Sequence, residues 1–168
     1  SLPMFKMATS ALILLVFANT GIHAQAELYP SMFPLGDVKL LDGPFKDLQT
    51  VNGKTLLAYD ADRLMQPYLK EAGLTAKGTA FSNWAGLDGH VGGHYLSALA
   101  MHYAATGDVQ IKARMDYVIS ELKRAQDANG KDANFSGYLC GLPNGKALWT
   151  KIKGGNTGAV WDAWVPWY

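Results

Sequence analysis

Polar and aromatic side chains that could bind a small ligand gather in one short stretch near the middle of the chain. Trp84 and Asp88 precede His90 and His94, whose spacing of four places both imidazoles on the same face of a helix. A Trp ring stacks on the C–H face of a sugar, and its N–H adds a hydrogen-bond donor. A carboxylate such as Asp88 can bind sugar hydroxyls. The stretch therefore predicts a sugar-binding site with these four residues as substrate contacts.

Each of these residues also has a structural interpretation. Asp88 stands where a carboxylate caps the N-terminus of a helix, and most Trp side chains belong to a core. Two His at this spacing can hold a metal, but the zinc-protease motif needs Glu after the first His, where Val91 stands. One imidazole can also pack while the other bonds to a neighbour. We predict no metal here, and we favour Trp84 among the tryptophans because its loop is rich in glycine.

Groups that could carry out covalent chemistry are scarce. Hydrolysis of a glycoside usually needs two carboxyl groups on either side of the bond. Glu71 and Glu121 do not suggest such a pair, and Glu121 is expected near the solvent face of its helix. Cys140 is the only cysteine, which excludes an internal disulfide, and a thiol needs a nearby base to act as a nucleophile. We therefore predict no catalytic residue in this chain.

A helical hairpin must position the site residues. Residues 89–105 form a helix that is apolar nearly all round, which predicts that other elements surround it. Gly107 ends this helix and Asp108 caps the next. The next helix, over 109–126, has one apolar face and one charged face. Alternation of an enclosed helix with an amphipathic one predicts a two-layered ring of helices.

The remaining elements have weaker patterns. Long loops are expected over 75–89 and 128–148. Around the hairpin the sequence predicts a short strand or edge segment at 38–41, a helix over 45–59, a short helix from Asp60 to about residue 70, and a last helix that begins near Trp149 or Asn156.

The N-terminal segment has the pattern of an export signal. Lys6 supplies a positive charge, residues 11–18 are an apolar run, and Ala24-Gln-Ala26 is a small-x-small cleavage site. The run is shorter than the roughly 20 residues that span a bilayer. We therefore predict a signal peptide over 1–26, a mature chain over 27–168 that is periplasmic or secreted, and no membrane attachment after cleavage. An uncleaved helix is the alternative.

The charge balance excludes some classes of partner. The chain has 15 basic and 14 acidic residues, and loss of the segment that holds Lys6 brings the net charge to zero. Such a surface has no basic field for nucleic acid or anionic lipid, so a neutral partner is expected. Residues 159–168 are strongly aromatic and resemble core, so we expect this chain to be the front part of a longer protein.

Six motifs follow one another along the chain: Leu35–Phe45, Asp60–Leu64, Glu71–Leu74, Gly89–Ala98, Ala105–Asp108 and Trp164–Tyr168. Together, in this order, they resemble the β-L-arabinofuranosidase group of bacterial glycoside hydrolases (families 127 and 146). The resemblance is strongest to secreted, Bacteroides-like members. It implies an all-α fold in which this chain supplies the N-terminal part of an (α/α)6 barrel of the six-hairpin glycosidase type.

The resemblance also implies an activity, namely release of terminal β-L-arabinofuranose from plant glycans with retention of configuration. In that family a cysteine acts as nucleophile in a zinc site of cysteines and a glutamate, and another glutamate is the acid/base. Those motifs come later in family members, so zinc is expected only in the full-length fold, and Cys140 does not match them. Family members often carry Glu after the first Trp of the site, where Ala85 stands here.

Two other classes of protein remain alternatives. One is a different (α/α)-barrel carbohydrate enzyme, such as a lyase or an epimerase, which would give other products. The other is a non-catalytic glycan-binding protein that keeps the helical scaffold, which would lack the later cysteine and glutamate motifs.

Overall fold

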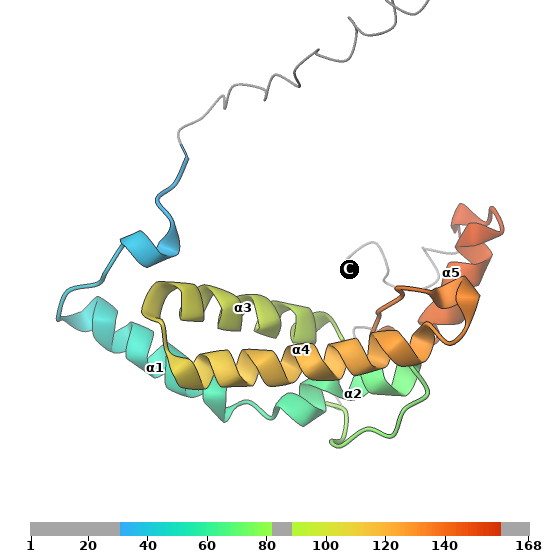
Figure 1. Ribbon diagram of the computed structural model, residues 1–168, viewed down its shortest axis with the longest axis horizontal. Coiled ribbons are helices and arrows are strands. Elements are labelled where there is room, and N and C mark those ends of the chain that lie inside the picture. The colour runs from blue at the N-terminus through green and yellow to red at the C-terminus, as the bar shows by residue number, and fades with distance from the viewer. Residues whose placement is uncertain (1–30, 82–88, 159–168) are drawn as a thin grey trace, which may run out of the picture. The chain divides into compact units, whose positions relative to one another are not determined.

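A computed structural model describes residues 31–81 and 89–158, and every regular element in these ranges is helical (Figure 1). Together with the described loops they belong to a unit that begins at Pro34. No described helix is both long and apolar enough to cross a membrane. The predicted all-α class is confirmed and is consistent with part of an α/α barrel. The helices are α1 (Pro44–Ala58), α2 (Ala61–Glu71), α3 (His90–Thr106), α4 (Val109–Asn129) and α5 (Gly145–Lys153), with short 3-10 helices η1 (Leu35–Asp37) and η2 (Ala133–Phe135).

The predicted hairpin is present as α3 and α4. Gly107 has a φ of 70°, and its N–H donates to the Tyr103 carbonyl at 2.7 Å, which ends α3. The Asp108 carboxylate accepts hydrogen bonds from the N–H groups of Gln110 and Ile111 at 2.8 and 3.3 Å, which starts α4. Two residues thus turn the chain back on itself, as their types predict.

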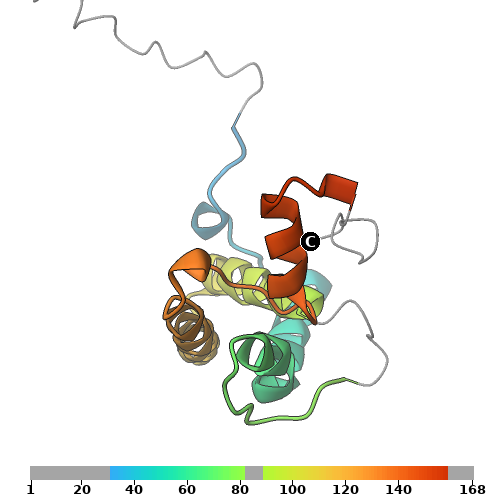
Figure 2. The ribbon, with the colours of Figure 1, turned by 90° about the vertical axis from the view of Figure 1, so that its right-hand side faces the viewer.

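The core lies where α2, α3 and α4 pack against one another, and Figure 2 looks nearly along α4, with α2 and α3 beside it. Only one face of α3 is buried, however. Met101 is 56% exposed, and Ser97, Ala100 and Ala104 are also exposed. The predicted enclosure of this helix is therefore incomplete among the described residues. The buried apolar residues of the main core are Leu56, Ala61, Leu64, Met65, Tyr95, Leu99, Ile111 and Val118.

Helix α1 confirms the helix predicted over 45–59. Gly53, which lowers helix propensity, has a packing reason, because a Cβ there would lie 2.7 Å from Nε2 of His102. His102 itself is buried. The first half of α1 is not covered by the described chain, since Phe45, Leu48 and Val51 are all more than half exposed.

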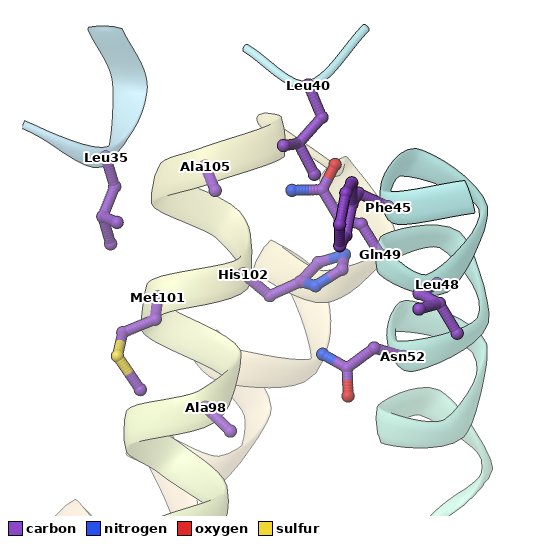
Figure 3. A pocket seen from close by; sticks show the side chains of 10 residues that line it. All are labelled: Leu35, Leu40, Phe45, Leu48, Gln49, Asn52, Ala98, Met101, His102 and Ala105. Carbon is purple, nitrogen blue, oxygen red and sulfur yellow. The ribbon is translucent and has the colours of Figure 1, made fainter. Parts of the chain in front are cut away.

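An apolar groove runs between α1, α3 and the segment around η1 (Figure 3), with a volume of about 570 Å³. Most of its wall is aliphatic or aromatic, and the Asn52, Gln49 and His102 side chains add polar atoms. The first half of α1 forms one wall of this groove and has no element packed over it in the described chain. The lining residues are Leu35, Leu40, Phe45, Leu48, Gln49, Asn52, Ala98, Met101, His102 and Ala105.

Two predicted elements need correction. Residues 38–41 are not a strand, because they pair with no other segment of the described chain. The last helix begins at Gly145 rather than near Trp149 or Asn156. The Asn144 and Gly145 pair looked like loop, but Asn144 adopts the left-handed conformation and Gly145 packs against Tyr138, so the helix starts earlier than its apolar residues suggest.

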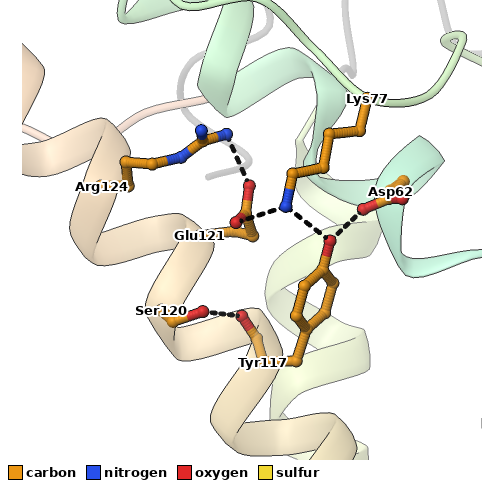
Figure 4. Close-up of polar contacts among 6 residues, drawn as sticks. All are labelled: Asp62, Lys77, Tyr117, Ser120, Glu121 and Arg124. Atoms are coloured by element: carbon orange, nitrogen blue, oxygen red, sulfur yellow. Dashed lines mark hydrogen bonds and ion pairs between the residues drawn. The ribbon is translucent and has the colours of Figure 1, made fainter.

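The position of Glu121 was also predicted wrongly. Its side chain is 7% exposed, and its carboxylate oxygens contact Lys77 Nζ and Arg124 Nη2 at 2.8 Å each (Figure 4). Lys77 also donates to Tyr117, whose hydroxyl donates to Asp62 and so has a raised pKa. This network fastens the segment that follows α2 onto α4. A long-range contact with Lys77 buries a carboxylate that the helix periodicity alone assigns to solvent.

Replacement of Glu121 by glutamine is expected to lower the free energy of unfolding by about 1–3 kcal/mol, because the neutral amide can accept from only one of the two cations and points an NH2 donor at the other. The matched control is Asp127→Asn, which removes an exposed ion pair with Lys123 on the same helix. That change is expected to cost less than about 0.5 kcal/mol. Urea denaturation measures both, and equal losses would contradict a special role for Glu121.

Candidate functional site

The predicted site lies at the N-terminal end of α3, where a loop turns into helix. Gly89 occupies the N-cap position with a φ of 87°, a conformation that favours glycine. A Cβ at Gly89 would lie 2.7 Å from the Cα of Gly141, so the loop after η2 touches the start of α3. Because both residues are glycines, the backbone of the loop can approach the backbone at the N-terminal end of α3, residues 89–94, which we call the helix mouth.

His90 and His94 come together on the first turn of α3, as their spacing predicts. Their Nε2 atoms are 3.1 Å apart, and the rings meet edge to face with centroids 4.5 Å apart. For the two to hydrogen-bond, one Nε2 must carry the proton and the other must accept the hydrogen bond. When both rings are neutral, the Nδ1 of the donating ring is bare and the Nδ1 of the accepting ring carries a proton. His94 is exposed and His90 is partly exposed.

The other two predicted contacts, Trp84 and Asp88, lie in 82–88, outside the described residues, so their placement stays a prediction. The segment that leads to them is anchored as far as Phe81. The Arg63 guanidinium donates to the carbonyls of Thr79 and Ala80 at 3.1 and 3.4 Å, and it stacks 3.9 Å above the Phe81 ring. This segment is therefore tied to the start of α2.

Tyr68 of α2 contacts the same mouth and was not predicted. Its hydroxyl donates to the Gly89 carbonyl at 2.5 Å. Burial raises the pKa of Tyr68 to about 12, helped by the nearby Cys140 and opposed by the backbone N–H of Gly93. The hydroxyl therefore stays protonated near neutral pH. Only the tertiary contact between α2 and α3 identifies this residue.

A second tyrosine lies behind the first. The Glu71 carboxylate accepts the Lys146 N–H at 2.7 Å and the Tyr138 hydroxyl at 3.5 Å, which joins α2, the loop and the start of α5. Burial, with smaller contributions from Cys140 and Glu71, raises the pKa of Tyr138 far above its ordinary value. Both tyrosines next to Cys140 are therefore neutral donors. The short Tyr-Leu-Cys run of this loop was the only signal in the sequence.

The surroundings of Cys140 favour the interpretation of an incidental thiol. The thiol is half-buried, and its Sγ accepts the Leu142 N–H at 3.3 Å. The phenols of Tyr68 and Tyr138 lie beside it. A phenol held protonated is a poor base. The Glu71 carboxylate close by already accepts the Lys146 N–H and the Tyr138 hydroxyl.

The zinc site expected of the full-length fold does not fit the described residues. Within 31–81 and 89–158 no group of three or more His, Cys, Asp or Glu side chains converges. Structural and catalytic zinc need three or four such ligands. The two glutamates of these ranges are engaged elsewhere, Glu71 at the start of α5 and Glu121 in its ion pairs. No chemical step through zinc follows from these residues.

Comparison with known proteins identifies the family to which the chain is similar. The chain matches the family model described as Beta-L-arabinofuranosidase, GH127 catalytic domain, over residues 37–168. The match therefore covers all five α-helices and the whole candidate site. No curated protein matches the chain.

Proposed function

Because the chain belongs to the GH127 β-L-arabinofuranosidase family of glycoside hydrolases, we propose that its enzyme releases terminal β-L-arabinofuranose from plant glycans with retention of configuration. The family match is the observation that carries this proposal. A glycoside hydrolase acts on a glycan, and the finer choice of sugar, linkage and stereochemistry is what the proposal adds.

In this proposal His90 and His94 contact the hydroxyls of the terminal sugar. Their paired imidazoles lie at the N-terminal end of α3, where the exposed His94 ring can bond a sugar hydroxyl. Trp84 and Asp88 complete the wall, the indole by stacking on the ring and the carboxylate by accepting hydroxyl protons. The site formed by this chain binds and orients the sugar, which supplies the proximity that catalysis needs.

We propose that the nucleophile, the acid/base and zinc belong to other parts of the enzyme. The described glutamates are both used by the fold, and no three metal ligands converge. The groove between α1 and α3 leaves Phe45, Leu48 and Met101 exposed, and further barrel helices would cover them. Export through the signal peptide over 1–26 would bring the enzyme to the periplasm or the medium, where plant glycans are met.

The test is hydrolysis of 4-nitrophenyl β-L-arabinofuranoside by the full-length enzyme, with the new anomer followed by ¹H NMR. The β-anomer of arabinose is expected to form first, because a covalent intermediate gives retention. The matched control is the α-L-arabinofuranoside, which is expected to react far more slowly. First appearance of the α-anomer would contradict retention, and preference for the control would contradict the proposed sugar.

A further inference from the structure

We propose that Tyr68 is the positioning residue of the His90–His94 pair, because its hydroxyl fixes the first turn of α3 on which both imidazoles stand. The importance of this role for activity rests on the proposed function, in which the pair contacts sugar. The role itself concerns only the geometry of the two rings.

The hydroxyl holds the backbone group from which this turn starts. It donates to the Gly89 carbonyl at 2.5 Å, and that carbonyl also accepts the N–H of Gly93. His90 directly follows the first of these glycines and His94 directly follows the second. A shift of the Gly89 carbonyl therefore moves both imidazoles.

The turn has little stability of its own. Its N-cap is Gly89, and Gly92 and Gly93 follow within the turn, each with a helix propensity about 1 kcal/mol below that of alanine. The hydrogen bond from the Gly93 N–H to the Gly89 carbonyl is 3.4 Å long, beyond the usual range. Because this bond is long, the Gly89 carbonyl depends on the Tyr68 hydroxyl as a second donor. Without it, the N-terminal turn of α3 would fray.

The Tyr68 side chain also fits closely against α3. The Tyr68 ring lies against Gly92, where a Cβ would come within 2.9 Å of Cε2, so no larger residue fits at position 92 without a shift of the ring. The phenol is partly buried and its pKa is about 12, which keeps the proton on the donor. Phenylalanine at position 68 would fill the same space but could not donate to the Gly89 carbonyl.

The test compares Tyr68→Phe with the unmodified enzyme by ¹H–¹⁵N NMR of histidine-labelled protein and by kinetics. In the unmodified enzyme, the Nε2 signals of His90 and His94 should report one protonated and one bare nitrogen. In the variant these signals are expected to shift or average, and KM should rise roughly three- to tenfold with kcat within about twofold. Introduction of 4-aminophenylalanine at position 68, which restores a donor, should recover both the original imidazole signals and the original KM.

The matched control is Tyr95→Phe, which removes another buried hydroxyl of the same kind, bonded to the Leu56 carbonyl at 2.7 Å. It is expected to lower the melting temperature but to leave the imidazole signals unchanged. Unchanged signals in Tyr68→Phe would overturn the positioning role, whatever the kinetics. Shifted signals with unchanged kinetics would support that role and overturn the sugar-binding role of the pair.

Discussion

Replacement of His94 by alanine is expected to lower kcat/KM for a β-L-arabinofuranoside by roughly 10- to 100-fold, which is about 1.4–2.7 kcal/mol of transition-state stabilisation. The imidazole forms one half of the hydrogen-bonded pair with His90, so its loss leaves sugar hydroxyls without a partner and removes one of the contacts that orient the His90 ring. Because the His94 side chain is exposed, the melting temperature should change little. Steady-state kinetics and thermal melting measure the two effects.

The matched control for this variant is Ser97→Ala, which shortens another exposed side chain of α3. Its kcat/KM is expected to stay within about twofold of the unmodified enzyme. His90→Ala should resemble His94→Ala, since either change removes the pair. If His94→Ala keeps both the kinetics and the melting temperature of the unmodified enzyme, the pair does not contact sugar.

Replacement of Gly92 by alanine is expected to lower the free energy of unfolding by about 1–3 kcal/mol, because the site has no room for a methyl group. An added Cβ would lie 2.9 Å from Tyr68 Cε2, 3.1 Å from Met65 Cε and 3.2 Å from the Leu64 carbonyl. The carbonyl belongs to a helix and cannot move aside, so α2 and α3 must separate. Urea denaturation measures the loss.

Its neighbour Gly93 is the matched control. There the nearest atom to an added Cβ is the Tyr68 hydroxyl at 4.0 Å. Gly93→Ala is therefore expected to stabilise the protein by up to about 1 kcal/mol, through helix propensity alone. Equal effects of the two substitutions would contradict the close packing of α2 on α3.

The sequence predicted those parts of the fold that short-range chemistry determines. Gly107 and Asp108 end one helix and begin the next because one tolerates a left-handed backbone and the other accepts amide hydrogen bonds. Asp60 caps α2 for the same reason. The spacing of His90 and His94 is likewise a property of any helix, so their meeting could be foreseen.

Features that depend on distant partners could not be predicted. Glu121 is buried because Lys77, from a separate loop, reaches it. Phe45 and Leu48 look like core by type, yet no described element covers them. The role of Tyr68 needs α2 to lie across the mouth of α3, and no local pattern encodes that arrangement. Periodicity gives the faces of a helix but not the elements that meet them.

The contrast between the α3–α4 hairpin and the helix mouth has a consequence for the order of folding. The hairpin joins sequence neighbours, so its formation closes only a short length of chain and loses little conformational entropy. The mouth needs Tyr68 from before α3 and Gly141 from after α4. During synthesis the hairpin can therefore form as soon as α4 has left the ribosome, while the imidazole pair is set in place only after the following loop has docked.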